Sequence, residues 1–231
     1  MKGPIEYIKE AFKIYTKKEN FLFFAKIMAV LTIISTIISY SHSYISRFVL
    51  SPINNSVRFN FDDIPLTILF ILIAIFSFIF YFYSTSTTYM SVLNLGMNEK
   101  EVFKLGYKKT WKLFVITLVF GLIVSFGAIL LVIPALIFSV WYMFSVLLVL
   151  DKNMKIGEAL KQSKMMVKGK FWAVLGRSLV FGLFGFVIGF VVAFIPYAGS
   201  IIVSFLAPLF ILPSYLLYRD LSAGLKDLGT I

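Results

Sequence analysis

Long blocks of apolar residues alternate with short polar segments along this chain of 231 residues. A block of about 20 residues is enough for an α-helix to cross a hydrocarbon core about 30 Å thick. Strands of a membrane barrel would alternate apolar and polar side chains, and these blocks do not. The pattern predicts six membrane-spanning helices, over Phe21–Tyr40, Pro65–Tyr83, Leu113–Ile133, Ala135–Leu150, Phe171–Ile195 and Gly199–Leu217.

The composition agrees with these blocks, because 60% of the residues are hydrophobic and only 14% are charged. Such proportions indicate an all-α polytopic membrane protein, and we expect one membrane domain over residues 1–231. The six spans pair as three hairpins. We expect a long loop from Ser41 to Ile64 to close the first hairpin, and tight turns at Ile133-Pro134 and around Pro196 to close the other two.

The basic residues lie almost entirely on one side of the predicted spans. The opposite side holds only Arg47 and Arg58. The positive-inside rule therefore predicts a multi-pass protein of the cell membrane, inner or plasma, with both termini in the cytoplasm. Since topology accounts for the net charge of +11, we expect no nucleic-acid partner.

The pentapeptide Leu-Val-Phe-Gly-Leu occurs twice, starting at Leu118 and at Leu179. Aligning the copies places Trp111 over Trp172 and Gly121 over Gly182. This correspondence runs the length of a span, so we interpret the two regions as copies of one unit. With an N-terminal copy recognised by order, the units are approximately 1–98, 99–152 and 153–231.

Each unit begins with a basic segment that carries a related tetrad: Glu10–Lys13, Glu101–Lys104 or Glu158–Lys161. Apolar and basic residues in these segments recur at helical spacing, with Ile5 and Phe12 on the apolar face of the first. We therefore expect an amphipathic interfacial helix before each hairpin. A basic residue beside an anionic leaflet contributes about 1 kcal/mol of binding, so anionic lipids are the expected partners.

The stretch from Glu101 to about Gly176 combines an amphipathic helix, a span that ends in Leu-Val-Ile-Pro, a return span, Leu150-Asp151-Lys152 and the segment Ile156–Ser163. It resembles the YciC-like bacterial inner-membrane proteins and the membrane domain fused to some glycerophosphoryl diester phosphodiesterases. The family's usual Ile-Pro-Gly turn ends in Ala135 here. The resemblance implies an architecture and no catalytic residue, and the phosphodiesterase domain is missing.

Two cations, Lys26 and Arg177, lie inside predicted spans, where ionisable residues are candidates for function. Each follows an aromatic residue at the start of its span by five positions, about 7.5 Å along a helix. Snorkelling to the cytoplasmic interface is the favoured interpretation. A site for a lipid headgroup or a substrate anion is the alternative. Four lysines of the basic segments are the other candidate lipid contacts: Lys104, Lys108, Lys161 and Lys164.

Small residues and prolines mark further positions in the spans. Close helix packing is the expected role of four glycines: Gly121, Gly182, Gly185 and Gly189. Pro208 and Pro213 should kink the last span, or act as a transporter hinge. The run Ser84 to Thr88 is expected to pack or to end a helix, with a polar path as the alternative.

No grouping of serine, histidine or carboxylates with catalytic or metal-binding spacing lies in the spans, so we expect no enzyme activity, no metal and no cofactor. The sequence favours a non-enzymatic protein that organises anionic lipid or a membrane-protein partner, which includes a homo-oligomer or a subunit of a larger complex. A small permease or channel for an apolar or anionic solute, with Arg177 as anion anchor, is the alternative.

Overall fold

The computed structural model of the chain describes residues 1–53, 56–59, 64–130, 132–195 and 198–226. These residues form nine helices and one strand pair. The helices are α1 (Pro4–Thr16), α2 (Lys18–Val49), α3 (Ile64–Leu93), α4 (Glu99–Leu130), α5 (Val132–Tyr142), α6 (Ser145–Asp151), α7 (Ile156–Val167), α8 (Phe171–Ala193) and α9 (Ala198–Lys226). The strands β1 (Leu50–Ile53) and β2 (Ser56–Phe59) pair antiparallel between α2 and α3.

The all-α polytopic class is confirmed, because six helical segments of the described residues are long and apolar enough to cross a membrane. The predicted spans fall in α2, α3, α4, the pair α5 and α6, α8 and α9, in that order. Most of these helices extend beyond the predicted bounds. The fourth span, Val132–Asp151, is interrupted at Met143 and Phe144, so that it consists of two helices.

The connections differ from the sequence prediction at two places. Helix α2 continues to Val49 and the strand pair follows, so the first connection is only partly a loop. Helix α5 begins at Val132, which places Pro134 in the first helical turn. The N–H groups of a first turn have no acceptor within the helix, so proline costs no hydrogen bond there. The turn between α8 and α9 lies where predicted, although residues 196–197 are outside the described residues.

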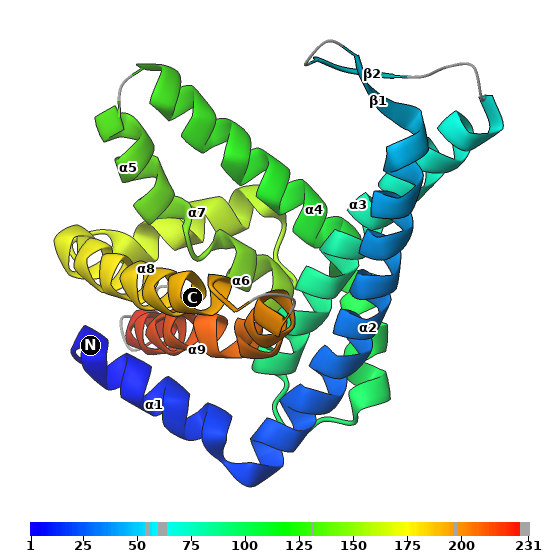
Figure 1. Cartoon of the computed structure of the whole chain (residues 1–231). Helices are drawn as coiled ribbons and strands as arrows, with labels where there is room; N and C mark the ends of the chain where they lie inside the picture. Colours follow the sequence, from blue (N-terminus) through cyan, green and yellow to red (C-terminus); the bar gives the residue numbers. More distant parts are fainter. Residues whose placement is uncertain (54–55, 60–63, 131, 196–197, 227–231) are drawn as a thin grey trace.

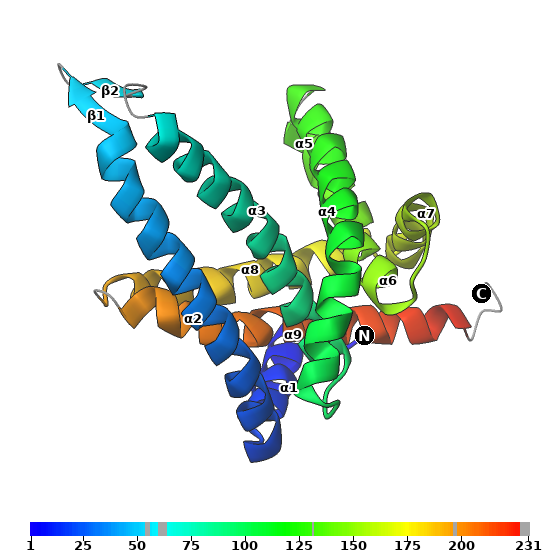
Figure 2. The same ribbon diagram turned by 90° about the vertical axis from the view of Figure 1, so that its right-hand side faces the viewer.

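The three hairpins diverge from a shared base (Figures 1 and 2). Figure 2 shows α8 and α9 running across the direction of α4 and α5, with α2 and α3 leaning away from both. Helices α1, α6 and α7 pack around this base. Side chains near the hairpin tips are exposed, as shown by Tyr40 (79%), Ile129 (82%) and Phe194 (73%).

The buried core lies in the base. It joins the first half of α2, through Phe24 and Ile27, to the end of α3, through Met90. Leu148 of α6 and Leu216 of α9 complete the same cluster. Since the core holds the ends of the hairpins together in the base and leaves their tips apart, most of the apolar surface outside the base must be covered by lipid.

The amphipathic segments enter the core through equivalent positions. The second residue of each tetrad, Ala11, Val102 or Ala159, is fully buried. The residue four positions later, Tyr15, Gly106 or Ser163, is also buried. This agreement supports the interpretation as three repeated units, which stays a prediction. The second amphipathic segment is no separate helix, because it continues into the span as part of α4.

Candidate functional site

Helices α3 and α4 come into close contact at one crossing near the base. A Cβ atom on Gly106 would overlap the Thr87 side chain and lie 2.9 Å from Thr87 Cα, so only glycine permits this approach. Thr87 donates its hydroxyl to the Tyr83 carbonyl of its own helix (2.9 Å), which keeps the contact compact. The two helices therefore hold a fixed relation on either side of Gly106.

Aromatic side chains fill the space beside this crossing. The ring of Phe114 on α4 packs edge-on against Phe82 and Phe78 of α3, with ring centres 5.1 and 5.9 Å apart. Trp111 lies 5.2 Å from the same Phe114 ring and is 71% exposed. An exposed tryptophan is typical of the level where headgroups meet acyl chains.

Two adjoining grooves run over this aromatic surface, with volumes of about 400 and 560 Å³. They share Ile79, Tyr107 and Thr110. Apart from one lysine in each, their walls are mostly aromatic and aliphatic. Lys108 borders the first groove and Lys104 borders the second. We call the two together the α3–α4 grooves.

Lys104 and Lys108 are both exposed and form no ion pair within the described part of the chain. They lie four residues apart on α4 and so share one face of the helix. Free ammonium groups above an apolar groove match a molecule that has an anionic head and an apolar chain. The structure thus brings two of the four predicted lysines together at one site.

The other two lysines lie elsewhere, on α7. Both Lys161 and Lys164 are exposed, and the Lys164 ammonium sits 4.1 Å from the centre of the Trp141 ring. This cation–π contact gives Lys164 a partner inside the protein. Neither Lys161 nor Lys164 lines the α3–α4 grooves.

The two cations predicted inside spans both have protein partners. Lys26 forms an ion pair with Glu99 at the start of α4 (2.8 Å). The Arg177 guanidinium donates to the backbone carbonyls of Lys2 (2.9 Å) and Ala173 (2.7 Å). Arg177 therefore ties α8 to the chain just before α1, a role that the sequence did not indicate.

The predicted glycine contacts are mostly absent between the described helices of one chain. A Cβ atom on Gly121, Gly182 or Gly189 would meet nothing within 4 Å, and one on Gly185 would lie 3.8 Å from the Phe210 ring. These glycines face lipid or open space. Their surfaces remain available for a second membrane helix, and packing there stays a prediction.

Helix α9 continues through Pro208 and Pro213. Proline 208 has no N–H to donate to the Ser204 carbonyl, and its ring crowds the carbonyls of the preceding turn. The neighbouring Phe205 carbonyl accepts a hydrogen bond from the Tyr15 hydroxyl of α1 (2.9 Å). The proline region of α9 thus provides an attachment point for α1.

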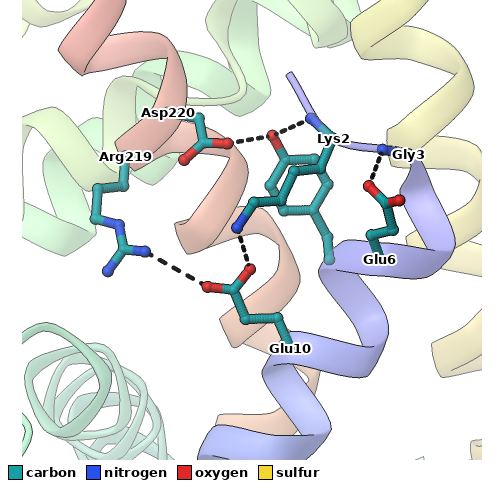
Figure 3. Close-up of polar contacts among 7 residues, drawn as sticks. Lys2, Gly3, Glu6, Glu10, Arg219 and Asp220 are labelled. Carbon is teal, nitrogen blue, oxygen red and sulfur yellow. Dashed lines mark hydrogen bonds and ion pairs between the residues drawn. The ribbon is translucent and has the colours of Figure 1, made fainter.

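A polar cluster, the α1 clamp, holds the N-terminus of α1 against α9 (Figure 3). The Tyr7 hydroxyl donates to Asp220 (2.7 Å) and accepts from the Lys2 backbone N–H (3.2 Å). Glu10 forms ion pairs with Lys2 and with Arg219 (3.6 Å). Burial, together with the hydrogen bond to Asp220, raises the pKa of Tyr7 from 10.0 to about 12.

A second polar cluster holds α7 against the interrupted fourth span. The buried Ser163 hydroxyl donates to the Trp141 carbonyl (2.7 Å) and accepts from the Phe144 N–H (3.2 Å). Nearby, the Tyr218 hydroxyl of α9 donates to Asp151 at the end of α6 (2.8 Å). The backbone groups at the interruption are therefore bonded within the protein and do not face a ligand.

Compared with protein-family models, with curated proteins and with solved structures, the chain matches none. The resemblance drawn from Glu101 to Gly176 accordingly stays an expectation. The geometry itself identifies an integral membrane protein, and the site it displays most clearly is the pair of α3–α4 grooves beneath Lys104 and Lys108.

Proposed function

We propose that this protein is a non-enzymatic component of the cell membrane that binds anionic lipid in the α3–α4 grooves, with both termini in the cytoplasm. The acyl chains lie on the aromatic walls formed by Phe78, Phe82 and Phe114. The phosphate lies beside the ammonium groups of Lys104 and Lys108. The observation that carries the proposal is the pairing of two unpartnered cations with grooves whose other walls are almost entirely apolar.

The positions of the basic segments support this orientation. Helix α1 docks through Tyr7, Ala11 and Tyr15 and leaves Ile5 and Phe12 exposed, at 62% and 55%. Apolar side chains on the free face of a basic helix are suited to the membrane interface. Lipid bound at the grooves would thus lie in the cytoplasmic leaflet, at the level of these helices.

Arg177 is less available as an anchor for a solute anion, because two of its five N–H groups already donate to backbone carbonyls. This weakens the permease alternative in its anionic form. A test that replaces Arg177 would also disturb the attachment of α1, so the lysines of α4 give the cleaner experiment.

The experiment compares retained lipid by native mass spectrometry in nanodiscs of phosphatidylglycerol and phosphatidylcholine. The test variant is Lys104→Gln with Lys108→Gln. The control is Lys9→Gln with Lys13→Gln, which removes two exposed charges from α1 without touching the grooves. At about 1 kcal/mol per lysine, the test variant should lose phosphatidylglycerol affinity about 30-fold. The control should keep most of it.

Equal losses of affinity in both variants would show a general attraction to anionic surfaces. This result would contradict specific binding of lipid in the α3–α4 grooves. Retention of no anionic lipid by the native chain would contradict the proposal altogether. Inorganic phosphate, added in excess, separates a lipid from a free anion: a site for lipid keeps its phosphatidylglycerol, because phosphate lacks the apolar chain.

A further inference from the structure

A second cavity, of about 220 Å³, lies where α9 passes α2 and α3. It is separate from the α3–α4 grooves and shares no lining residue with them. Six of its lining side chains are serine or threonine: Thr32, Ser35, Ser84, Thr85, Thr88 and Ser204. Thr32 lies 11 residues beyond Phe21, about 16 Å along α2, whereas Thr88 adjoins Thr87 of the Gly106 crossing, so the cavity extends from beside the base into the bundle.

Most of these hydroxyls present oxygen lone pairs and no free proton. Their protons are used on carbonyls of their own helices: Ser35 on Thr32 (2.9 Å), Thr85 on Tyr81 (2.8 Å), Thr88 on Ser84 (2.9 Å) and Ser204 on Ser200 (2.9 Å). A hydroxyl has one proton and two acceptor lone pairs. The cavity wall is therefore rich in hydrogen-bond acceptors, and a good occupant must donate.

Ser84 and Thr32 are the two exceptions, since neither hydroxyl donates to a carbonyl of the described residues, and of the two only Thr32 is buried. Its side chain is 92% buried, and its hydroxyl has no hydrogen-bond partner among the described residues. An unpaired buried hydroxyl is unfavourable, and Thr32 lines the cavity, so a turn of its side chain would let this hydroxyl donate to an occupant that accepts a hydrogen bond. Threonine in a helix populates two χ1 rotamers, which lets the hydroxyl turn toward such an occupant.

Charge limits the occupant further. No charged side chain lines the cavity in the part of the chain that the structure describes. An ion would thus enter the cavity without a counter-charge, which is unfavourable. A neutral molecule that both donates and accepts satisfies all three conditions. At roughly 30 Å³ per water, the volume equals about seven waters, enough for a small polyol.

We propose that this cavity is a binding site for a small neutral polyol. The hydroxyls of the polyol donate to Ser35, Thr85 and Thr88 and accept from Thr32. Met28, Leu31 and Ile211 supply apolar walls for its carbon atoms. This inference does not depend on the lipid proposal, because the two sites use different residues.

Glycerol is the probe, and its binding to the purified full chain in deuterated detergent is followed by saturation-transfer-difference NMR. The test variant, Thr32→Val, keeps the side-chain shape and removes only an unpaired hydroxyl, so the protein should fold at least as well. Loss of one hydrogen bond should weaken glycerol binding about fivefold. Thr117→Val is the control, because Thr117 is exposed on α4, away from the cavity.

A second variant, Ala207→Leu, fills the cavity and should abolish the saturable signal. The proposal is overturned if glycerol shows no saturable binding to the native chain, which would mean that the cavity holds only water or lipid. It is also overturned if Thr32→Val and Thr117→Val weaken binding equally, or if Ala207→Leu binds glycerol like the native chain.

Discussion

Removing the Tyr7 hydroxyl should loosen the attachment of α1 to the rest of the base. The ring of Tyr7 is fully buried and packs edge-on against Phe181 of α8, with ring centres 6.1 Å apart. The substitution Tyr7→Phe keeps this packing and removes two hydrogen bonds, the one to Asp220 and the one from the Lys2 backbone N–H. Any effect therefore reports on the polar contacts of the hydroxyl and not on the packing of the ring.

The magnitude follows from the charge of the partner. A hydrogen bond to a charged group contributes about 1.5–3 kcal/mol. The rise in the pKa of Tyr7 to about 12 is caused first by burial and then by the bond to Asp220, so it supports the presence of this bond and does not measure its strength. Asp220 is partly exposed, so water replaces some of the lost bond. We expect a net loss of about 1–2 kcal/mol.

Hydrogen exchange followed by mass spectrometry measures this loss locally. A destabilisation of 1–2 kcal/mol should speed exchange of the α1 amides about 5- to 30-fold if α1 undocks as a unit. Tyr40→Phe serves as the control, because Tyr40 is 79% exposed near a hairpin tip. Equal exchange of α1 in the two variants would show that the hydroxyl of Tyr7 does not hold the helix.

The pH dependence gives an independent check. Since folding raises the pKa of Tyr7, its contribution to stability is complete below pH 10 and is lost as the pH rises toward 12. The native chain should therefore lose about 1–2 kcal/mol more than Tyr7→Phe between pH 10 and 12. Parallel pH profiles, measured by unfolding in mixed micelles, would contradict the assignment.

Four further substitutions can be compared by the same unfolding titration. Gly106→Ala should destabilise the protein by about 2–3 kcal/mol, because the new Cβ meets the Thr87 backbone, whereas Gly121→Ala enters open space and should be neutral or stabilising by up to about 1 kcal/mol. Ser163→Ala leaves two buried backbone groups unpaired and should lose about 2–4 kcal/mol. Lys26→Gln breaks the ion pair with Glu99, in which the lysine side chain is 67% exposed, so it should cost less than about 1 kcal/mol of stability. A larger loss would show that this pair is more than a surface contact.

The sequence predicted the spans well because membrane insertion imposes a simple rule of length and apolarity. The shared tetrads were identified in the sequence, whereas the burial of their second residue, Ala11, Val102 or Ala159, was not predicted and is found only in the structure. Lys104 and Lys108 were identified as candidate lipid contacts by their helical spacing. The aromatic grooves beneath them were not predicted, because they depend on the pairing of α3 with α4. That pairing is set by a contact between two small residues, Thr87 and Gly106, which carries no strong sequence signal.

Contacts across long sequence separations were missed for the same reason. The hydrogen bond from Tyr7 to Asp220 joins residues 213 positions apart, and that from Tyr15 to Phe205 joins residues 190 apart. Neither tyrosine differs in local sequence from the other aromatic residues of the chain. By contrast, the Gly185–Gly189 motif gives a clear local signal, and yet a Cβ atom on Gly189 would meet no neighbouring helix within 4 Å. A small-residue motif indicates that close approach is permitted and does not identify the partner.

The divergence of the hairpins follows from where the contacts lie. Only 6% of the most apolar window of α3 is buried, compared with 33% in α2 and in α9. In lipid, the hydrophobic effect does not drive apolar helix faces together, so hairpins remain joined only where close packing or polar contacts hold them. Here those contacts are the Gly106 crossing, the α1 clamp and the Ser163 bonds, all of which lie in the base. Between the tips, lipid is the remaining neighbour, and a protein with this distribution of contacts presents an unusually large part of its apolar surface to the membrane.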